Sequence, residues 1–327
     1  MEENGQLHFS DDPIIPGLNE ACSLIETGQL ESALLILDGL LNKAPDAPGI
    51  EAGYRIARFW LNRAENINDI PDGKDTADFL LEEWQIFLDY ARSNNLLNTH
   101  PFHAIEKYIH YTAGENYKLA FKNADNPTNN IDAILKLAIC FMKLGDYNLT
   151  IDTLEYARSS STANPELLAL LGESYYHRRD IPKALLLFRE AFFIDPTKID
   201  LNILTAEPII RLKEIAAEEK TGWGDVKEWI PVFGHLTDIF YVKRHLTMQA
   251  VDLITKDIYT LEKTYQTMSA DRVRGTNTAP RLINKYLWLF DFYKEQNYNF
   301  ENLSDIRSRL IEIDKKLFVP YFKNIKL

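Results

Sequence analysis

The sequence lacks long apolar runs and the short motifs that bind nucleotides, activate serine nucleophiles or hold zinc. No stretch of about 18 apolar residues occurs, so no membrane-spanning helix is predicted. The patterns GxGxxG, GxxxxGKS/T, GxSxG, CxxC and HExxH are absent as well. We therefore expect no cofactor and no metal, and these patterns identify no catalytic residue.

Cysteine is scarce, with Cys22 and Cys140 as the two examples in the chain. Both fall in apolar faces of predicted helices, where a cysteine behaves as a small hydrophobic residue. We expect two buried, reduced thiols and no disulfide framework.

The chain also lacks a positive charge balance, since Lys and Arg number 36 against 48 Asp and Glu, a net charge of −12. General binding to nucleic acid or to anionic membranes requires a basic surface, so both are disfavoured, although a local basic patch stays compatible with this balance. Residues 1–13, MEENGQLHFSDDP, have neither the basic start nor the apolar core of a secretory signal. We expect a cytoplasmic protein. The sequence does not distinguish this from a protein that is exported by an unusual route.

What is present is a composition typical of a folded protein. Hydrophobic residues make up 46% of the 327 residues, aromatic residues make up 12%, and glycine occurs only 14 times. This length suits two ordinary domains or one extended array of repeats.

One stretch, residues 165–196, has the most regular pattern in the chain. Large residues recur there at steps of three and four, which predicts two short packed helices. Gly172 and Ala184 are small residues that face the seam between these helices, so the two backbones can approach closely, and Pro196 ends the second helix. Other residues of the two packed faces are Leu168, Leu171, Tyr175, Phe188 and Ala191.

This ordering of large and small positions, closed by a proline, resembles the tetratricopeptide repeat, a helix–turn–helix unit of 34 residues. All eight signature positions are filled acceptably, with Leu168 where the family often has Trp. The resemblance implies an all-α, right-handed helical solenoid of about five helix pairs. Fold alone does not determine function.

Two further stretches follow the same register. Residues 14–46 form a first repeat with Gly28 in its turn, where a residue free to adopt positive φ closes the hairpin. Residues 131–162 form a fourth repeat with Gly145 in its turn, and Ala138 precedes Gly172 by 34 positions, as adjacent repeats require.

The stretch between these repeats is less regular. Ala21 and Ala138 are 117 residues apart, 15 more than three repeats of 34 would occupy. We place the surplus in a long loop around Pro71-Asp72-Gly73, so that a second repeat spans residues 53–95 with its second helix over 76–92. Residues 98–125 match the repeat pattern weakly, and one long helix is the alternative there.

The predicted repeat domain spans residues 14–198, and residues 199–327 form a predicted helical capping or docking domain. Helices are expected from Pro208 to Glu219 and over 246–268, 279–296 and 303–324, with a polar, basic loop at 269–280. Within residues 223–244, Pro231 and Gly234 are expected to break the chain, and residues 239–242 are expected to form a short strand or buttress. This domain either caps the repeats or docks on their inner surface.

Three clusters carry weaker functional hypotheses. His103, Glu106 and His110 share a helical face, which permits a metal site, although surface or hydrogen-bonded histidines are the default interpretation. Three arginines flank the loop at 269–280 and would suit a phosphate or carboxylate, but such loops are usually just solvated. The aromatic residues of segment 223–244 are more often core than a binding surface. The arginines are Arg272, Arg274 and Arg281, and the aromatic residues are Trp223, Trp229, Phe233, Phe240 and Tyr241.

The resemblance directs attention to the concave surface, which in tetratricopeptide proteins is lined by the first helix of each pair. The positions it implies here are Leu18, Cys22 and Ile25 in repeat one; Leu135, Ile139, Met142 and Lys143 in repeat four; and Ala169, Glu173, Tyr176 and His177 in repeat five. Lys143 is the lone basic residue at positions where family members that clamp a carboxylate place Lys, Arg and Asn, so such a clamp is not expected.

An apolar groove suits an amphipathic helix, contributed by a partner or by the chain's own C-terminal part. The sequence therefore predicts a non-enzymatic adaptor that binds a protein or peptide in this groove. The alternative is a ligand- or peptide-sensing protein whose C-terminal domain closes over the groove. The hypothesis of an enzyme is supported only by the histidine and arginine clusters. Adaptor is favoured because few convergent polar groups are available to orient a small ligand. Oligomeric state stays open, since an apolar edge at repeat one would allow two chains to pair.

Overall fold

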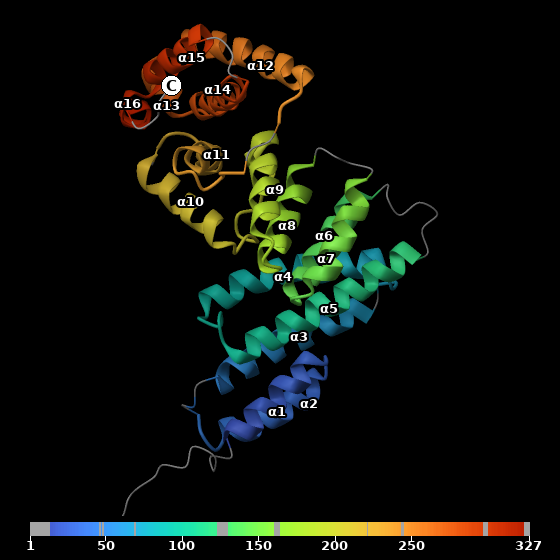
Figure 1. The fold of residues 1–327 in the computed structure, drawn as a ribbon. Coiled ribbons are helices and arrows are strands. Elements are labelled where there is room, and N and C mark those ends of the chain that lie inside the picture. The colour runs from blue at the N-terminus through green and yellow to red at the C-terminus, as the bar shows by residue number, and fades with distance from the viewer. Residues whose placement is uncertain are drawn as a thin grey trace, which may run out of the picture. The chain divides into compact units, whose positions relative to one another are not determined.

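A computed structural model describes residues 14–45, 47, 49–68, 70–122, 130–159, 164–220, 222–242, 245–296 and 300–323. Within these residues the chain is helical and contains no β-strand (Figure 1). The predicted all-α class is therefore confirmed. Contacts divide the chain into two compact units, Met1–Thr153 and Leu154–Leu327, which we describe separately.

The first unit is built on paired antiparallel helices and one long single helix. Its helices are α1 (Ile14–Glu26), α2 (Leu30–Leu41), α3 (Ile50–Asn68), α4 (Lys74–Ser93), α5 (His100–Lys122) and α6 (Ile131–Lys143), and α7 (Tyr147–Arg158) crosses the boundary between the units. Helix α5 packs against α1, α3, α4 and α6, so it occupies the centre of this unit.

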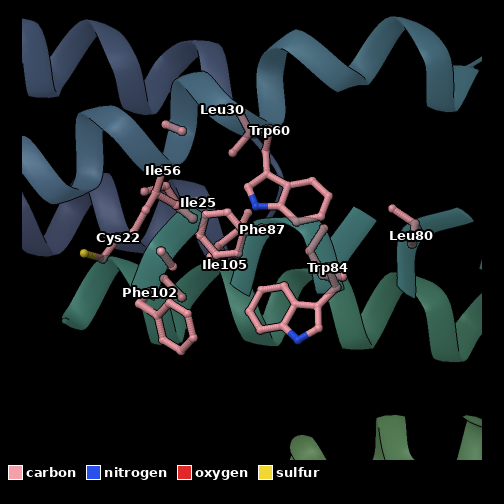
Figure 2. Close-up of a cluster of buried hydrophobic side chains, with 14 of the residues drawn as sticks. Cys22, Ile25, Leu30, Ile56, Trp60, Leu80, Trp84, Phe87, Phe102 and Ile105 are labelled. Carbon is pink, nitrogen blue, oxygen red and sulfur yellow. The ribbon is translucent and has the colours of Figure 1, made fainter. Parts of the chain in front are cut away.

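Aromatic side chains dominate the core of the first unit. Trp60 from α3, Trp84 and Phe87 from α4, and Phe102 from α5 cluster there (Figure 2). Ring centroids of Trp84 and Phe87 are 5.3 Å apart, and those of Trp84 and Phe102 are 5.6 Å apart. Rings at these separations add packing energy beyond the area that they bury.

The turns of the repeats require a left-handed residue at the second position after the first helix. Gly28 has φ +77° and Gly145 has φ +78°, as predicted from their place in the turn. In the third such hairpin the position is held by Arg179, with φ +67°. A side chain at Gly28 would also collide with Tyr108, because a Cβ there would lie 2.3 Å from its ring.

The predicted long loop in repeat two is wrong. Helix α3 extends to Asn68 and α4 begins at Lys74, so the connection is short. The surplus residues instead lengthen the helices to 19 and 20 residues, against 13 and 12 for α1 and α2. Polar residues such as Asn62 and Asn66 lie exposed on α3, where a helix accommodates them on its solvent face.

Repeat three is a single helix. Residues 100–122 form α5 without interruption, which confirms the alternative of one long helix and removes one of the predicted helix pairs. The last predicted residues of that repeat, 123–125, lie outside the described residues.

The second unit starts with the most closely packed helix pair, α8 (Pro165–His177) and α9 (Ile181–Ile194). A Cβ at Gly172 would lie 2.9 Å from the ring of Phe188, so the predicted small residue is what lets α8 and α9 approach. A short 3-10 turn, η2 (Pro196–Lys198), follows where Pro196 was predicted to end the helix. The remaining helices are α10 (Glu207–Glu219), α11 (Val226–Leu236), α12 (Met248–Thr267), α13 (Ala270–Arg274), α14 (Thr278–Glu295), α15 (Phe300–Ile313) and α16 (Lys315–Lys323).

Several predicted details of the C-terminal part need correction. Pro231 and Gly234 lie inside α11 and do not break it, and residues 239–242 form a turn and an irregular stretch, not a strand. The predicted basic loop contains the short helix α13. The last predicted helix divides at Asp314, which accepts a hydrogen bond from the N–H of Leu317 at 3.1 Å and so begins α16.

The predicted domain boundary at Lys198 falls inside the second unit, since α9 contacts both η2 and α11.

Among the described helices, none has both the length and the apolar character needed to cross a membrane.

Candidate functional site

The predicted groove positions of repeat one are mostly covered by the chain itself. Cys22 and Ile25 are buried in the core of the first unit, while Leu18 is half-buried. Helix α5 packs along α1, and its Lys107 lies 3.1 Å from the carboxylate of Glu26. Burial, followed by the nearby Glu26 charge, raises the pKa of the Cys22 thiol to about 11, so this cysteine is an unreactive packing residue.

The groove positions of repeat four divide in the same way. On α6, Leu135 and Met142 are buried, Ile139 is half-buried and Lys143 is exposed. The Lys143 ammonium lies 3.4 Å from the carboxylate of Glu106 on α5. The lone basic residue of the predicted groove is therefore already paired within the unit.

Glu173 of repeat five binds backbone groups of its own chain. It is 1% exposed, and its carboxylate accepts hydrogen bonds from the N–H of Thr205 at 2.6 Å, the Thr205 hydroxyl at 2.6 Å and the N–H of Ala206 at 3.1 Å. Ala206 is the N-cap of α10, so the carboxylate fixes the two residues that lead into this helix and places a negative charge near its N-terminus. His177 Nε2 lies 3.0 Å from the same carboxylate.

Of the predicted groove residues, those that retain accessible surface are Leu18, Ile139, Lys143, Tyr176 and His177. The buried ones are Cys22, Ile25, Leu135, Met142, Ala169 and Glu173. For the buried residues, packing by the chain itself is the role that the structure shows.

An exposed groove between α2 and α3, with leucines in its lining, is not among the predicted surfaces. Its cavity of about 600 Å³ is lined by Leu34, Leu35 and Leu61 together with Tyr54 and Arg58. Leu35 is 78% exposed, although leucine usually lies inside a folded protein. The signal was present in the sequence, because α2 (LESALLILDGLL) carries leucines on more than one face.

The histidine cluster does not form a metal site. His110 is buried, its Nδ1 lies 2.7 Å from the backbone oxygen of Glu106, and its ring stands edge-on to Trp84. Burial lowers the pKa of His110 to about 4, which keeps the ring neutral. His103 is exposed and lies 3.7 Å from the Glu106 carboxylate. In the described part of the chain, no group of three His, Cys, Asp or Glu residues is arranged to hold a metal ion.

The three arginines do not converge on a common point. Arg281 donates from Nε and Nη2 to Oε1 of the buried Glu228, at 2.7 and 2.5 Å. Arg274 lies over the ring of Trp223, 5.1 Å from its centroid, and Arg272 is exposed. Burial raises the pKa of the Glu228 carboxyl, against the opposing effect of Arg281.

The aromatic segment is mostly core, as the sequence favoured. Trp229, Phe233 and Phe240 are buried, Trp223 is half-buried, and Tyr241 is 49% exposed. The indole N–H of Trp229 donates to the backbone oxygen of Trp223 at 2.6 Å, so its polar atom is satisfied inside the unit.

Comparison with known proteins supports the family resemblance. Residues 132–159, which cover most of α6 and all of α7, match the family model of the tetratricopeptide repeat. Neither the curated proteins nor the solved structures that were compared with the chain include a match. The match places a tetratricopeptide repeat at the position predicted for repeat four.

Proposed function

We propose that this protein is a non-enzymatic scaffold or adaptor that binds an amphipathic helix or peptide of a partner protein in the cytoplasm. The observation that carries this proposal is the match of residues 132–159 to the tetratricopeptide repeat, in a chain whose described part is built from helices. Domains of this family generally bind proteins or peptides, and the family is typically non-enzymatic.

The proposed contacts are the predicted groove residues that keep accessible surface. In the first unit, Leu18 of α1 and Ile139 of α6 would supply apolar contacts. In the second unit, Tyr176 of α8 would supply one. An amphipathic helix recognised in this way inserts apolar residues at helical spacing and leaves its polar face in water. The groove at Leu35 is a second apolar surface available to a partner.

The test is quantitative capture of partners from native cell extract by the full chain and four variants. Ile139→Asp and Tyr176→Asp each place a charge where the partner's apolar face is proposed to lie. The matched controls are Leu149→Asp and Tyr156→Asp, which change exposed residues of α7 outside the predicted groove. We expect the groove variants to reduce capture of the same partner about tenfold or more, while the controls retain it.

Circular dichroism should show that all four variants keep their helical content. If the two groove variants fold soundly and capture every partner at the wild-type level, the proposed groove is not the binding surface.

A second candidate function is a sensor whose C-terminal part regulates access to the groove. It is favoured by Glu173, a predicted groove residue whose carboxylate binds the backbone N–H groups of Thr205 and Ala206 just before α10. Releasing this contact with Glu173→Ala should increase partner capture if the C-terminal part regulates the groove, and should leave it unchanged for a simple adaptor. Glu214→Ala, at an exposed position of α10, is the control.

A further inference from the structure

The second unit contains a cavity of about 350 Å³ bounded by the end of α9, α11, α12 and α14. Phe193, Pro196 and Leu261 form its apolar surface, and charged residues face it from the other helices. This volume falls in the range of small-molecule sites, which combine apolar walls with a few polar groups.

Asn284 is the unusual residue of this cavity. It is 6% exposed, yet within the described residues its side-chain amide has no hydrogen-bond partner. The amide atoms are not enclosed, since Trp60 Nε1 is the one fully buried side-chain polar atom without a partner in the described residues. The Asn284 amide is therefore accessible at the cavity that it lines and open to a ligand. Asn284 lies between Arg281 and Lys285 on one face of α14, by the helical spacing of three and four residues, and all three line the cavity. An amide offers one acceptor and two donors, so its natural complement is another amide.

The charges around Asn284 come in opposite pairs. Arg281 is bound to Glu228, and the Lys285 ammonium lies 3.0 Å from Asp257 and 4.4 Å from the ring centroid of Phe193. Since each cation already has a carboxylate partner, we expect a ligand with a single charge of either sign to gain little electrostatic binding energy in this cavity. A ligand that carries both a positive and a negative charge can interact with the cations and the carboxylates of both ion pairs at once.

Each charged group has hydrogen-bonding capacity left for such a ligand. Arg281 uses Nε and Nη2 for Glu228 and leaves Nη1, while Lys285 has three N–H donors and one carboxylate partner. On the acidic side, Asp195 accepts from the N–H and hydroxyl of Thr197 through Oδ1, which leaves Oδ2.

We propose that this cavity binds a zwitterionic peptide of dipeptide size. The peptide amide pairs with Asn284, the carboxylate approaches Lys285 and Arg281, and the ammonium approaches Asp195 and Asp257. This inference goes beyond the proposed partner-binding role and does not depend on it.

The first experiment compares two probes by calorimetry on the full chain. Glycylglycine carries both charges and one amide, whereas 5-aminopentanoate has the same number of chain atoms and the same charges without the amide. We expect glycylglycine to bind with a Kd of about 1 mM or tighter. It should bind about tenfold more tightly than 5-aminopentanoate, because about two amide hydrogen bonds are lost with the latter. Equal affinity for the two probes, or no binding of glycylglycine at about 10 mM, would overturn the proposal.

A third probe tests the charges. N-acetylglycine N-methylamide carries two amides and neither charge, so we expect it to bind at least about tenfold more weakly than glycylglycine. Equal binding of this probe would overturn the zwitterionic part of the proposal.

Variants then separate binding from folding. Asn284→Leu keeps a similar volume and removes the unpaired amide, so the melting temperature should stay the same or rise while the preference for glycylglycine is lost. Asn302→Leu, at an exposed position of α15, is the matched control and should bind like the wild type. If Asn284→Leu fails to fold, Lys285→Met tests the same site, because it keeps the apolar stem and removes the charge. Wild-type binding by whichever of these two variants folds would contradict the assignment.

Discussion

At the scale of single residues, Arg179 has a backbone conformation that usually requires glycine. Arg179 has φ +67° at the turn position that Gly28 and Gly145 occupy in the other two hairpins. A non-glycine residue pays roughly 1–2 kcal/mol in this region, whereas glycine costs about 0.5–1 kcal/mol of additional chain entropy. The difference favours glycine by about 0–1.5 kcal/mol, with a midpoint of about 0.75 kcal/mol.

We therefore predict that Arg179→Gly raises the free energy of unfolding by about 0.5–1 kcal/mol. The measurement is urea unfolding followed by circular dichroism. Arg178→Gly is the matched control, since Arg178 has φ −80° and gains nothing from glycine. That control should lose about 0.5–1 kcal/mol. Equal losses in both variants would show that the turn does not strain Arg179.

Two buried tryptophans of equal exposure differ in how their indole N–H groups are satisfied. Trp60 and Trp229 are each 1% exposed. In the described part of the chain, the Trp60 N–H has no acceptor, whereas the Trp229 N–H donates to the backbone oxygen of Trp223. Replacing the Trp229 donor loses this hydrogen bond, whereas replacing the Trp60 donor loses none and removes a buried polar group without a partner.

Trp229→Phe should therefore cost about 1–2 kcal/mol more than Trp60→Phe, in addition to the loss of volume common to both. Unfolding should be followed by far-UV circular dichroism, because each change removes a fluorophore. Each free energy is taken from the transition of the unit that carries the substitution. A larger loss for Trp60→Phe would mean that its N–H makes a stabilising contact.

At the scale of helices, one carboxylate joins three elements of the first unit. Asp78 on α4 accepts a hydrogen bond from the hydroxyl of Tyr117 on α5 at 2.6 Å and from the ammonium of Lys136 on α6 at 2.8 Å. It also pairs with Lys74 on its own helix. Burial acts to raise the pKa of Asp78, but the hydrogen bonds from Lys136, Lys74 and Tyr117 outweigh it and hold the pKa at about 2.

This shift predicts a specific acid sensitivity. Because the pKa in the folded state lies below the ordinary value of about 3.9, the stabilisation is complete above about pH 4 and is lost as the pH falls towards about 2. The loss amounts to about 2 kcal/mol. Denaturant unfolding between these pH values should show this slope in the wild type and not in Asp78→Asn. Asp89→Asn, at a position 81% exposed on the same helix, should keep it. An unchanged slope in Asp78→Asn would assign the acid sensitivity to other carboxylates.

The same scale shows what the sequence could predict about this fold. The sequence predicts the helix pairs α1–α2, α6–α7 and α8–α9, because residues close together in the chain determine them. Gly172 permits close helix packing, and Gly28 permits the turn. For α5 the sequence leaves a weak repeat and one long helix as alternatives, because what stabilises the long helix is packing against four other helices. Pro231 predicts a break, yet it lies in a buried part of α11, where tertiary packing offsets its local cost.

The candidate site was less predictable than the fold. The resemblance identified positions on α1, α6 and α8, but whether the chain itself covers them depends on contacts between residues far apart in sequence. Cys22 is covered by α5, and Glu173 is bound by residues 205–206. The cavity at Asn284 combines four helices, none of which carries a recognisable motif.

At the scale of the whole molecule, the position of the unit boundary decides what unfolds together. Contacts place it between Thr153 and Leu154, so α8 and α9 belong with the C-terminal helices, whereas the sequence predicts a boundary at Lys198. Phe192 on α9 is fully buried and its ring stacks on Phe240, 6.3 Å away, which links α9 to the segment after α11. Removing a buried phenylalanine side chain typically costs about 3–5 kcal/mol.

Phe192→Ala should therefore accelerate amide hydrogen exchange in α8, α9 and α11 together and leave α4 and α5 protected. Phe87→Ala, which removes a fully buried ring from the first unit, is the reciprocal variant and should loosen α4 and α5 while leaving α9 and α11 protected. The two boundaries give opposite results for Phe192→Ala. With a boundary at Lys198, faster exchange would spread from α9 into the first unit and stop before α10. Both variants remove the same side chain from a fully buried position, so the two substitutions are matched in severity. A difference in which helices exchange faster therefore reports which helices unfold as one cooperative unit.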